Sequence, residues 1–308
     1  MMNIATTIVP IFSVIVLGWI AHRRGFIPAE FIVPANRIVY YLAIPAMIFK
    51  VVARTDFSSS FQGRVTVIAW LAMAATFAFS WGTGKLIQFR RGRLSTFIQS
   101  GYHCNIGYMA LAVAYYYLGN EGLARTGMLA AFLMLLQNVL SVAVLSYYAR
   151  EETGGQKWRR TVANIFGNPI LLAAAAGMLF SLLRIPVPSV ADRSLEILGG
   201  MALPMALILI GASLSFRMIR RHLWAILWSA GAVKLLLLPG LAYAAFRFLE
   251  IPGRDFLPAI ILLASPTATV TYVMAREMGG DPDFAVGAVS AGTLLSAVTF
   301  SFWLSLSA

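Results

Sequence analysis

The chain has 308 residues, of which 59% are hydrophobic and only 12% are charged. Because a soluble domain carries about 25% charged residues, this composition excludes a soluble globular protein and predicts one that crosses a membrane many times. The formal charge of +12 comes from Lys and Arg residues in short loops between apolar stretches. This placement favours loops that orient membrane spans over a nucleic-acid-binding face. The single cysteine, Cys104, excludes an internal disulfide.

The N-terminal apolar stretch resembles a secretory signal only in its length. No basic residue precedes its apolar core, whereas Arg23 and Arg24 follow it. A signal peptide has the opposite polarity, so we expect a retained first span that starts outside the cytoplasm.

Ten apolar stretches follow one another along the chain, separated by charges, glycines, prolines and polar clusters. Most have the roughly 20 residues that a helix needs to cross the hydrocarbon. They lie near residues 4–21, 34–53, 65–87, 97–118, 123–149, 162–183, 195–215, 222–248, 256–276 and 284–306. The sequence therefore predicts an all-α membrane protein with ten transmembrane helices.

Basic residues are distributed unequally over the two sides that these spans define. If the N-terminus lies outside, fifteen Lys and Arg residues fall in cytoplasmic loops and seven on the opposite side, while Lys50 and Lys234 lie within spans. Because cytoplasmic loops are enriched in Lys and Arg, both termini are predicted to lie outside the cytoplasm.

The chain repeats itself weakly at an offset of about 160 residues. The sequence LGNEG at 118–122 matches MGGDP at 278–282, and Pro45 in AIPAM matches Pro204 in ALPMA. Inverted repeats are typical of transporters, whose substrate sites form where interrupted helices meet near the bilayer midplane.

The boundary between the two copies falls in a polar and basic segment, REETGGQKWRR, at residues 150–160. We therefore divide the chain into two five-helix repeats, residues 1–153 and 154–308. Because five is an odd number of spans, the second repeat must be inverted relative to the first.

Polar residues interrupt the fourth and ninth spans at matching positions. Asn105, Ile106 and Gly107 in the fourth span align with the segment 265–267 in the ninth at an offset of 160. Pro266 lacks an N–H and should break the helix. Ordinary kinks repaired by Ser and Thr are one explanation. Matched breaks in inverted repeats favour a shared site instead, where half-helix N-termini would suit an anion.

Several polar side chains lie at membrane depth. Lys234 lies twelve residues into a span that begins at His222, and no Asp or Glu lies well inside any span. Lys234 is therefore either a functional charge or a structural donor to the carbonyls of a broken helix. Lys50 is expected to snorkel to the outer surface. Gln137 and Asn138 either line a site or hold helices together.

The sequence lacks the signatures of several other membrane proteins. It has no intramembrane carboxylate of the kind that a sodium/proton antiporter uses, no H-E-x-x-H motif and no G-x-x-x-x-G-K-[ST] loop. We therefore expect neither an enzyme nor a metal or cofactor, and ATP-driven pumping by this chain alone is excluded.

Four segments carry a more specific pattern. They are ANRIVYYLAIPAMIF at 35–49, NIGYMALAVAYYYLG at 105–119, KLLLLPGL at 234–241 and ASPTATVTYVMAREMGGDP at 264–282. These segments resemble the auxin efflux carrier family, which includes plant PIN-type carriers and bacterial transporters of organic acids. The resemblance implies crossed, broken helices 4 and 9, with the substrate bound at the crossing. It also implies a scaffold of helices 1, 2, 6 and 7, homodimerisation through that scaffold, and elevator-like movement of helices 3–5 and 8–10.

The resemblance also implies roles for individual residues. Asn105 takes the place of the family's crossover asparagine and Pro266 that of its crossover proline, and Asn138 stands near a carboxylate-binding asparagine of PIN-type members. The predicted substrate site comprises Asn105, Cys104, Ile106, Gly107, Ser265, Pro266, Thr267, Asn138 and Lys234. Two departures, Ala112 in place of a PIN-type proline and a short cytoplasmic loop, favour a bacterial-type member and argue against auxin.

The leading hypothesis is a secondary transporter of small organic anions, with carboxylates as the expected class, in a bacterial cytoplasmic membrane. Its expected partners are the anion, membrane lipid and a second copy of the chain. The alternative is a non-transporting membrane receptor or subunit that binds a small anion. The residues leave the substrate's identity, the direction of transport and the coupling ion open.

Overall fold

The computed structural model describes residues 4–56, 62–149, 167–215 and 224–307. Within these ranges the chain is all-helical and has no strand, and one isolated antiparallel bridge joins Cys104 to Thr267. The predicted all-α class is therefore confirmed. The predicted linker at 150–160, with the repeat boundary inside it, lies outside the described residues.

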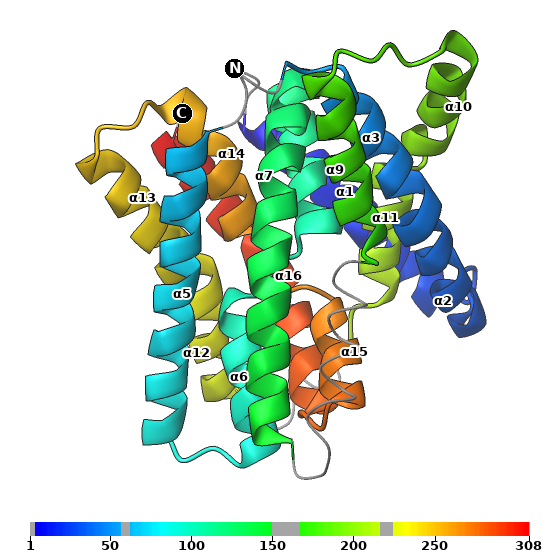
Figure 1. Ribbon diagram of the computed structural model, residues 1–308. Helices are drawn as coiled ribbons and strands as arrows, with labels where there is room; N and C mark the ends of the chain where they lie inside the picture. Colours follow the sequence, from blue (N-terminus) through cyan, green and yellow to red (C-terminus); the bar gives the residue numbers. More distant parts are fainter. Residues whose placement is uncertain (1–3, 57–61, 150–166, 216–223, 308) are drawn as a thin grey trace. The chain divides into compact units, whose positions relative to one another are not determined.

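The α-helices follow one another along the described parts of the chain (Figure 1). In chain order they are α1 Ile4–Arg23, α2 Ala29–Ile38, α3 Ile44–Ala53, α5 Gly63–Leu86, α6 Arg91–Tyr102, α7 Leu111–Tyr148, α9 Pro169–Leu182, α10 Ser189–Gly200, α11 Ala202–Ala212, α12 Trp224–Ala232, α13 Leu238–Phe248, α14 Gly253–Ala264, α15 Val270–Glu277 and α16 Pro282–Ser307.

Three π-helical turns each lead directly into an α-helix. They are η1 Val39–Ala43 between α2 and α3, η2 Ile106–Ala110 before α7, and η3 Val233–Leu237 between α12 and α13. Single π-turns of this kind are frequent at functional sites because they shift the phase of the side chains that follow.

Seven helical stretches among the described residues are long and apolar enough to cross a membrane. They are Ile4–Arg23, Ala29–Ala53, Gly63–Leu86, Ile106–Tyr148, Ser189–Ala212, Ile226–Phe248 and Pro282–Ser307. The prediction of a protein that crosses the membrane many times agrees with this length and composition.

The difference between seven stretches and the ten predicted spans has three local causes. The predicted fourth and fifth spans share the stretch Ile106–Tyr148, which leaves helical geometry at Gly119, where φ is 69°. The described part of the sixth, α9, has 14 residues. The ninth consists of α14, with 12 residues, and α15, with 8, and each is too short to span the hydrocarbon alone.

The chain forms two compact units, each drawn from both halves of the sequence. The first unit comprises Met1–Gly63, Ile106–Phe132 and Phe166–Ser213. The second unit comprises Arg64–Asn105, Leu133–Ile165 and Leu214–Ala308. The helices α1–α3 and α9–α11 thus belong to the first unit, and α5, α6 and α12–α16 to the second.

Close backbone contact at glycines holds the first unit together. A Cβ atom added to Gly18 of α1 would collide with the carbonyl oxygen of Ile208 in α11. A Cβ at Gly177 of α9 would lie 3.0 Å from Cβ of Val52 and 3.2 Å from the carbonyl oxygen of Phe49, both in α3. Small residues at helix contacts allow this approach, which is a common way to associate helices in lipid.

The first unit also contains an ion-pair network between α3 and α10. Lys50 Nζ lies 3.0 Å from Glu196 Oε2 and 3.8 Å from Asp192 Oδ2, and Arg54 Nη2 lies 2.7 Å from the same Asp192 oxygen. The sequence predicts that Lys50 extends to the outer surface, and in the structure its ammonium ends beside Glu196, whose side chain is 68% exposed. The sequence did not reveal its partners because they lie about 140 residues away, on another helix.

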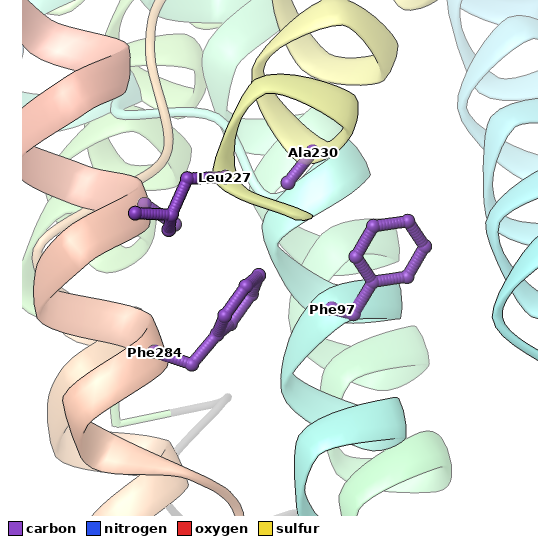
Figure 2. Packing of buried hydrophobic residues seen from close by; sticks show 5 residues of the cluster. Phe97, Leu227, Ala230 and Phe284 are labelled. Carbon is purple, nitrogen blue, oxygen red and sulfur yellow. The ribbon is translucent and has the colours of Figure 1, made fainter. Parts of the chain in front are cut away.

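An apolar cluster packs three helices of the second unit together (Figure 2). Phe97 of α6, Leu227 and Ala230 of α12, and Phe284 and Ala288 of α16 are all buried there. Away from this cluster, Trp303 of α16 donates its indole N–H to the carbonyl oxygen of Leu235 in η3, at 2.8 Å. These contacts fix α6, α12 and α16 around the segment that carries the predicted site.

Candidate functional site

Two helices of the second unit end abruptly in its buried interior. Helix α14 ends at Ala264 because Ser265 precedes a proline, which disfavours the helical conformation, and Ser265 is extended with φ −62° and ψ 147°. Helix α6 ends at Tyr102, where His103 turns to φ −75° and ψ 101°. The breaks predicted from polar residues in the fourth and ninth spans are therefore present.

The two broken ends satisfy each other's backbone groups. The N–H of Asn105 donates to the carbonyl oxygen of Pro266 at 2.9 Å, and the N–H of Ala268 donates to the carbonyl oxygen of His103 at 3.0 Å. These bonds flank the bridge between Cys104 and Thr267. Asn105 and the segment 265–267 are thus close neighbours despite their distance in sequence. Non-helical backbone at membrane depth requires such internal partners.

Lys234 supports the end of α14. Its side chain is 1% exposed, and Nζ donates to the carbonyl oxygen of Leu263 at 2.7 Å. Cys104 Sγ lies 3.9 Å from the same oxygen. A cation at a helix C-terminus interacts favourably with the unpaired carbonyls there. Of the two roles that the sequence left open for Lys234, the structure shows the donation to a carbonyl of a broken helix, two residues before Ser265.

Gln137 supports the other broken end. Its Oε1 accepts the N–H of Cys104 at 3.0 Å, and its Nε2 donates to the carbonyl oxygen of Cys104 at 3.4 Å. Ser141, one helical turn further, is hydrogen-bonded to His103 Nδ1 at 2.7 Å and to the Tyr102 hydroxyl at 2.9 Å. One face of the second half of α7 therefore holds residues 102–104.

The sequence prediction selected Asn138 rather than Gln137 for the site. Asn138 is half-buried, and its side chain makes no hydrogen bond to the residues that the structure describes. No sequence signal separates the two amides, because Leu133, Gln137 and Ser141 share one helix face, and Met134, Asn138 and Val142 share the next face at the same four-residue spacing.

Asn105 carries the most conspicuous unused group of the site. The residue is 4% exposed, and its amide nitrogen has no hydrogen-bond partner within the described part of the chain. By contrast, the Thr267 hydroxyl donates to the carbonyl oxygen of Ser100 at 2.9 Å, and the Ser265 hydroxyl donates to that of Leu262 at 2.7 Å. The amide nitrogen is one of twelve buried side-chain atoms without a partner among the described residues, and it is free to donate to an acceptor.

The remaining predicted site residues are apolar or backbone contributors. Ile106 and Gly107 open η2 in the first unit, and Ile106 is 1% exposed. Pro266 is buried and contributes its carbonyl oxygen to the bridge. No group of three or more His, Cys, Asp or Glu residues that could hold a metal ion occurs among the described residues. The side-chain donors of this region that could serve an anion are the Asn105 amide and the Lys234 ammonium.

A family model described as membrane transport protein matches the chain over residues 3–158 and 158–304. The chain belongs to this family. The resemblance to auxin efflux carriers is thereby confirmed. An uncharacterized transporter of Methanothermobacter thermautotrophicus is 27% identical over 305 residues, with 98% of each chain covered. A putative malonate transporter of Rhizobium meliloti is 27% identical over 309 residues, covering 97% of this chain and 94% of the relative. An uncharacterized transporter of Methanocaldococcus jannaschii is 21% identical, with 95% of each chain covered.

Proposed function

We propose that this membrane transport protein is a secondary transporter of small organic anions, with carboxylates as its substrate class. The observation that carries the proposal is the buried, unpartnered amide nitrogen of Asn105 next to the Cys104–Thr267 bridge, with the Lys234 ammonium at the Leu263 carbonyl near the end of α14. A carboxylate accepts hydrogen bonds from both kinds of donor. The relative named as a putative malonate transporter supports a carboxylate.

We further propose ten spans in two inverted repeats, with helices 4 and 9 crossing at the bridge. Left-handed backbone conformations support this arrangement because they recur at nearly the repeat offset. The described residues with positive φ form three pairs at offsets of 159, 162 and 160: Gly25 with Arg184, Gln88 with Glu250, and Gly119 with Gly279. Since few non-glycine residues adopt positive φ, such a regular recurrence indicates equivalent turns.

Packing within the first unit gives independent support. Gly18 approaches the carbonyl oxygen of Ile208, and Gly177 approaches that of Phe49. Gly177 follows Gly18 by 159 residues, and Ile208 follows Phe49 by the same 159. The contact between α1 and α11 therefore has its counterpart between α9 and α3, as two related repeats packed around a pseudo-two-fold axis require.

The proposed mechanism is an elevator in which helices 3–5 and 8–10 move against a dimeric scaffold of helices 1, 2, 6 and 7. The two compact units support this division for α1–α3 and α9–α11 on one side and for α5, α6 and α12–α16 on the other. The segment Ile106–Phe132 is grouped with the first unit, so the boundary passes through the proposed fourth and fifth helices. A bacterial cytoplasmic membrane with both termini outside completes the proposal.

Counterflow in liposomes tests the proposed function. Purified protein is reconstituted into liposomes loaded with unlabelled malonate, and the uptake of labelled malonate is followed. A transporter accumulates label transiently above the level of protein-free liposomes. Saturable malonate binding without any counterflow would instead support the alternative, a membrane receptor that binds a small anion without moving it.

A further inference from the structure

Lys234 is the buried Lys or Arg of the second unit, as far as the structure describes that unit. Among the residues that the structure describes, the buried charged side chains are Asp192, in the first unit, and Lys234, in the second. The ammonium of Lys234 is held by a backbone carbonyl, which is a dipole and not a full negative charge. An ammonium in the interior of a membrane protein is costly unless a counter-charge compensates it.

No carboxylate in the described part of the second unit lies near this ammonium. The elements packed against η3 are α6, α12, α13, α14 and α16. The titratable or charged residues on these elements and at the adjoining bridge are Arg91, Arg93, Tyr102, His103, Cys104, Tyr243, Arg247, Arg254, Asp255 and Asp283. The described part of α12 contributes none. Only two of these residues are acids.

Both acids lie at the far ends of their helices. Asp255 precedes Leu263 by eight residues, which is about 12 Å along α14. Asp283 precedes Trp303, which bonds η3, by twenty residues, or about 30 Å along α16. Neither can neutralise Lys234.

The helix ends at the bridge do not supply a further net charge of either sign. α6 and α14 end there with their carbonyls, and η2 and α15 begin there with their N–H groups. Such ends carry opposite partial charges of about half a unit, so they largely offset one another.

His103 is the remaining group that could add positive charge. It neighbours Cys104, whose sulfur shares the Leu263 carbonyl with Lys234, and its Nδ1 is already bonded to the Ser141 hydroxyl at 2.7 Å. A second cation this close to Lys234 is disfavoured by like-charge repulsion in an apolar interior. The site therefore offers a ligand one positive charge.

We propose that the bridge site compensates one negative charge, so that it binds a monocarboxylate, or a dicarboxylate as its singly charged hydrogen form, and rejects the dianion. This inference rests on the proposed function and narrows its substrate class. A dianion would leave one uncompensated charge in the interior, whereas a monoanion forms a neutral pair with Lys234, which is far less costly to carry through hydrocarbon.

Calorimetric titration of the purified full-length protein tests the charge count. Two probes are compared at pH values below and above the second ionisation of malonic acid: malonate, and monomethyl malonate, which keeps a single charge at both. We expect malonate affinity to fall at the higher pH in proportion to the loss of hydrogen malonate, while monomethyl malonate affinity stays constant. Malonate affinity that is unchanged or higher at the higher pH would overturn the inference but leave the proposed function intact. Failure of both probes to bind at either pH would refute the proposed function itself.

Variants of Lys234 test whether its ammonium is the positive charge that compensates the bound anion. Lys234→Met should weaken monomethyl malonate binding by about 30-fold or more, because the anion loses its buried partner. Lys234→Arg should restore part of the affinity, and Lys85→Met, which removes an exposed ammonium, should bind like the wild type. Unchanged binding by Lys234→Met would show that the compensating charge lies elsewhere. The two-probe comparison on the wild type decides the charge count even if Lys234→Met fails to fold.

Discussion

The side chain of Gln137 bonds both the backbone N–H and the backbone carbonyl of Cys104. Gln137 is therefore the main support of the chain just after α6. Its amide matches the peptide group, donating with nitrogen and accepting with oxygen. All four atoms are buried in the second unit. Leaving a buried N–H or C=O without a partner costs about 1–3 kcal/mol for each group.

Replacing Gln137 should therefore destabilise the protein measurably. We expect Gln137→Leu to lower the free energy of unfolding by about 2 kcal/mol, because the Cys104 peptide loses both partners. The matched control is Asn138→Leu, which removes the neighbouring amide and should change stability by no more than about 0.5 kcal/mol. Thermal unfolding of both variants in detergent measures the difference. Equal losses would contradict the role assigned to Gln137.

Residue chemistry in the sequence predicted part of this site. Asn105 and Pro266 could be identified because an amide and a proline inside apolar stretches are conspicuous. Gln137 and Asn138 could not be separated by chemistry, since both are amides. Their helical phase decides which one faces the bridge, and one residue of difference rotates a side chain by about 100°. The partners of Lys50 lie on another helix and left no local signal.

Helix contacts in the first unit depend on glycines that admit no side chain. Gly18→Ala should lower the free energy of unfolding by about 1–3 kcal/mol, because the new Cβ meets the backbone of α11, which cannot move aside as a side chain can. Gly82→Ala is the matched control, since nothing lies within 4 Å of its Cβ position. It should be neutral or stabilising by up to about 1 kcal/mol. Thermal unfolding compares the two, and a Gly18→Ala protein as stable as Gly82→Ala would contradict the close contact.

The sequence predicted helices well where a long apolar stretch marks them, and less well where a helix is interrupted. The break at Ser265–Pro266 followed from the missing N–H of proline, and the break before Asn105 followed from clustered polar residues. The π-turns η1 and η3 could not be predicted, because Val39–Ala43 and Val233–Leu237 differ from regular helix only in hydrogen-bond phase.

The orientation of the whole molecule is a further prediction. The excess of Lys and Arg in the proposed cytoplasmic loops places both termini outside. Reporter fusions after Arg23, Arg160 and Ala308 should read inside, inside and outside, respectively. A cytoplasmic C-terminus combined with a cytoplasmic Arg23 fusion would contradict an inverted repeat of five plus five spans, because ten spans return the chain to its starting side.

At the scale of the whole molecule, the family and the transport class could be predicted from four short segments, and the membership is now shown. The grouping of Ile106–Phe132 with the first unit could not be predicted. Sequence periodicity indicates which residues form a helix, but it does not indicate which neighbours that helix packs against. The break at 103–105 separates the segment Ile106–Phe132 from α6, so its packing could not be inferred from that of α6.

Counterflow by the Asn105→Ala variant tests the central claim most directly. Purified wild-type protein, Asn105→Ala and Asn120→Ala are reconstituted in equal amounts into malonate-loaded liposomes, and uptake of labelled malonate is followed. Asn120 is exposed, so its variant controls for loss of an amide elsewhere. We predict wild-type counterflow, unchanged counterflow for Asn120→Ala, and a loss of at least about tenfold for Asn105→Ala, equivalent to one buried hydrogen bond to a charged ligand. Counterflow by Asn105→Ala equal to that of the wild type would contradict the assignment of the bridge as the substrate site.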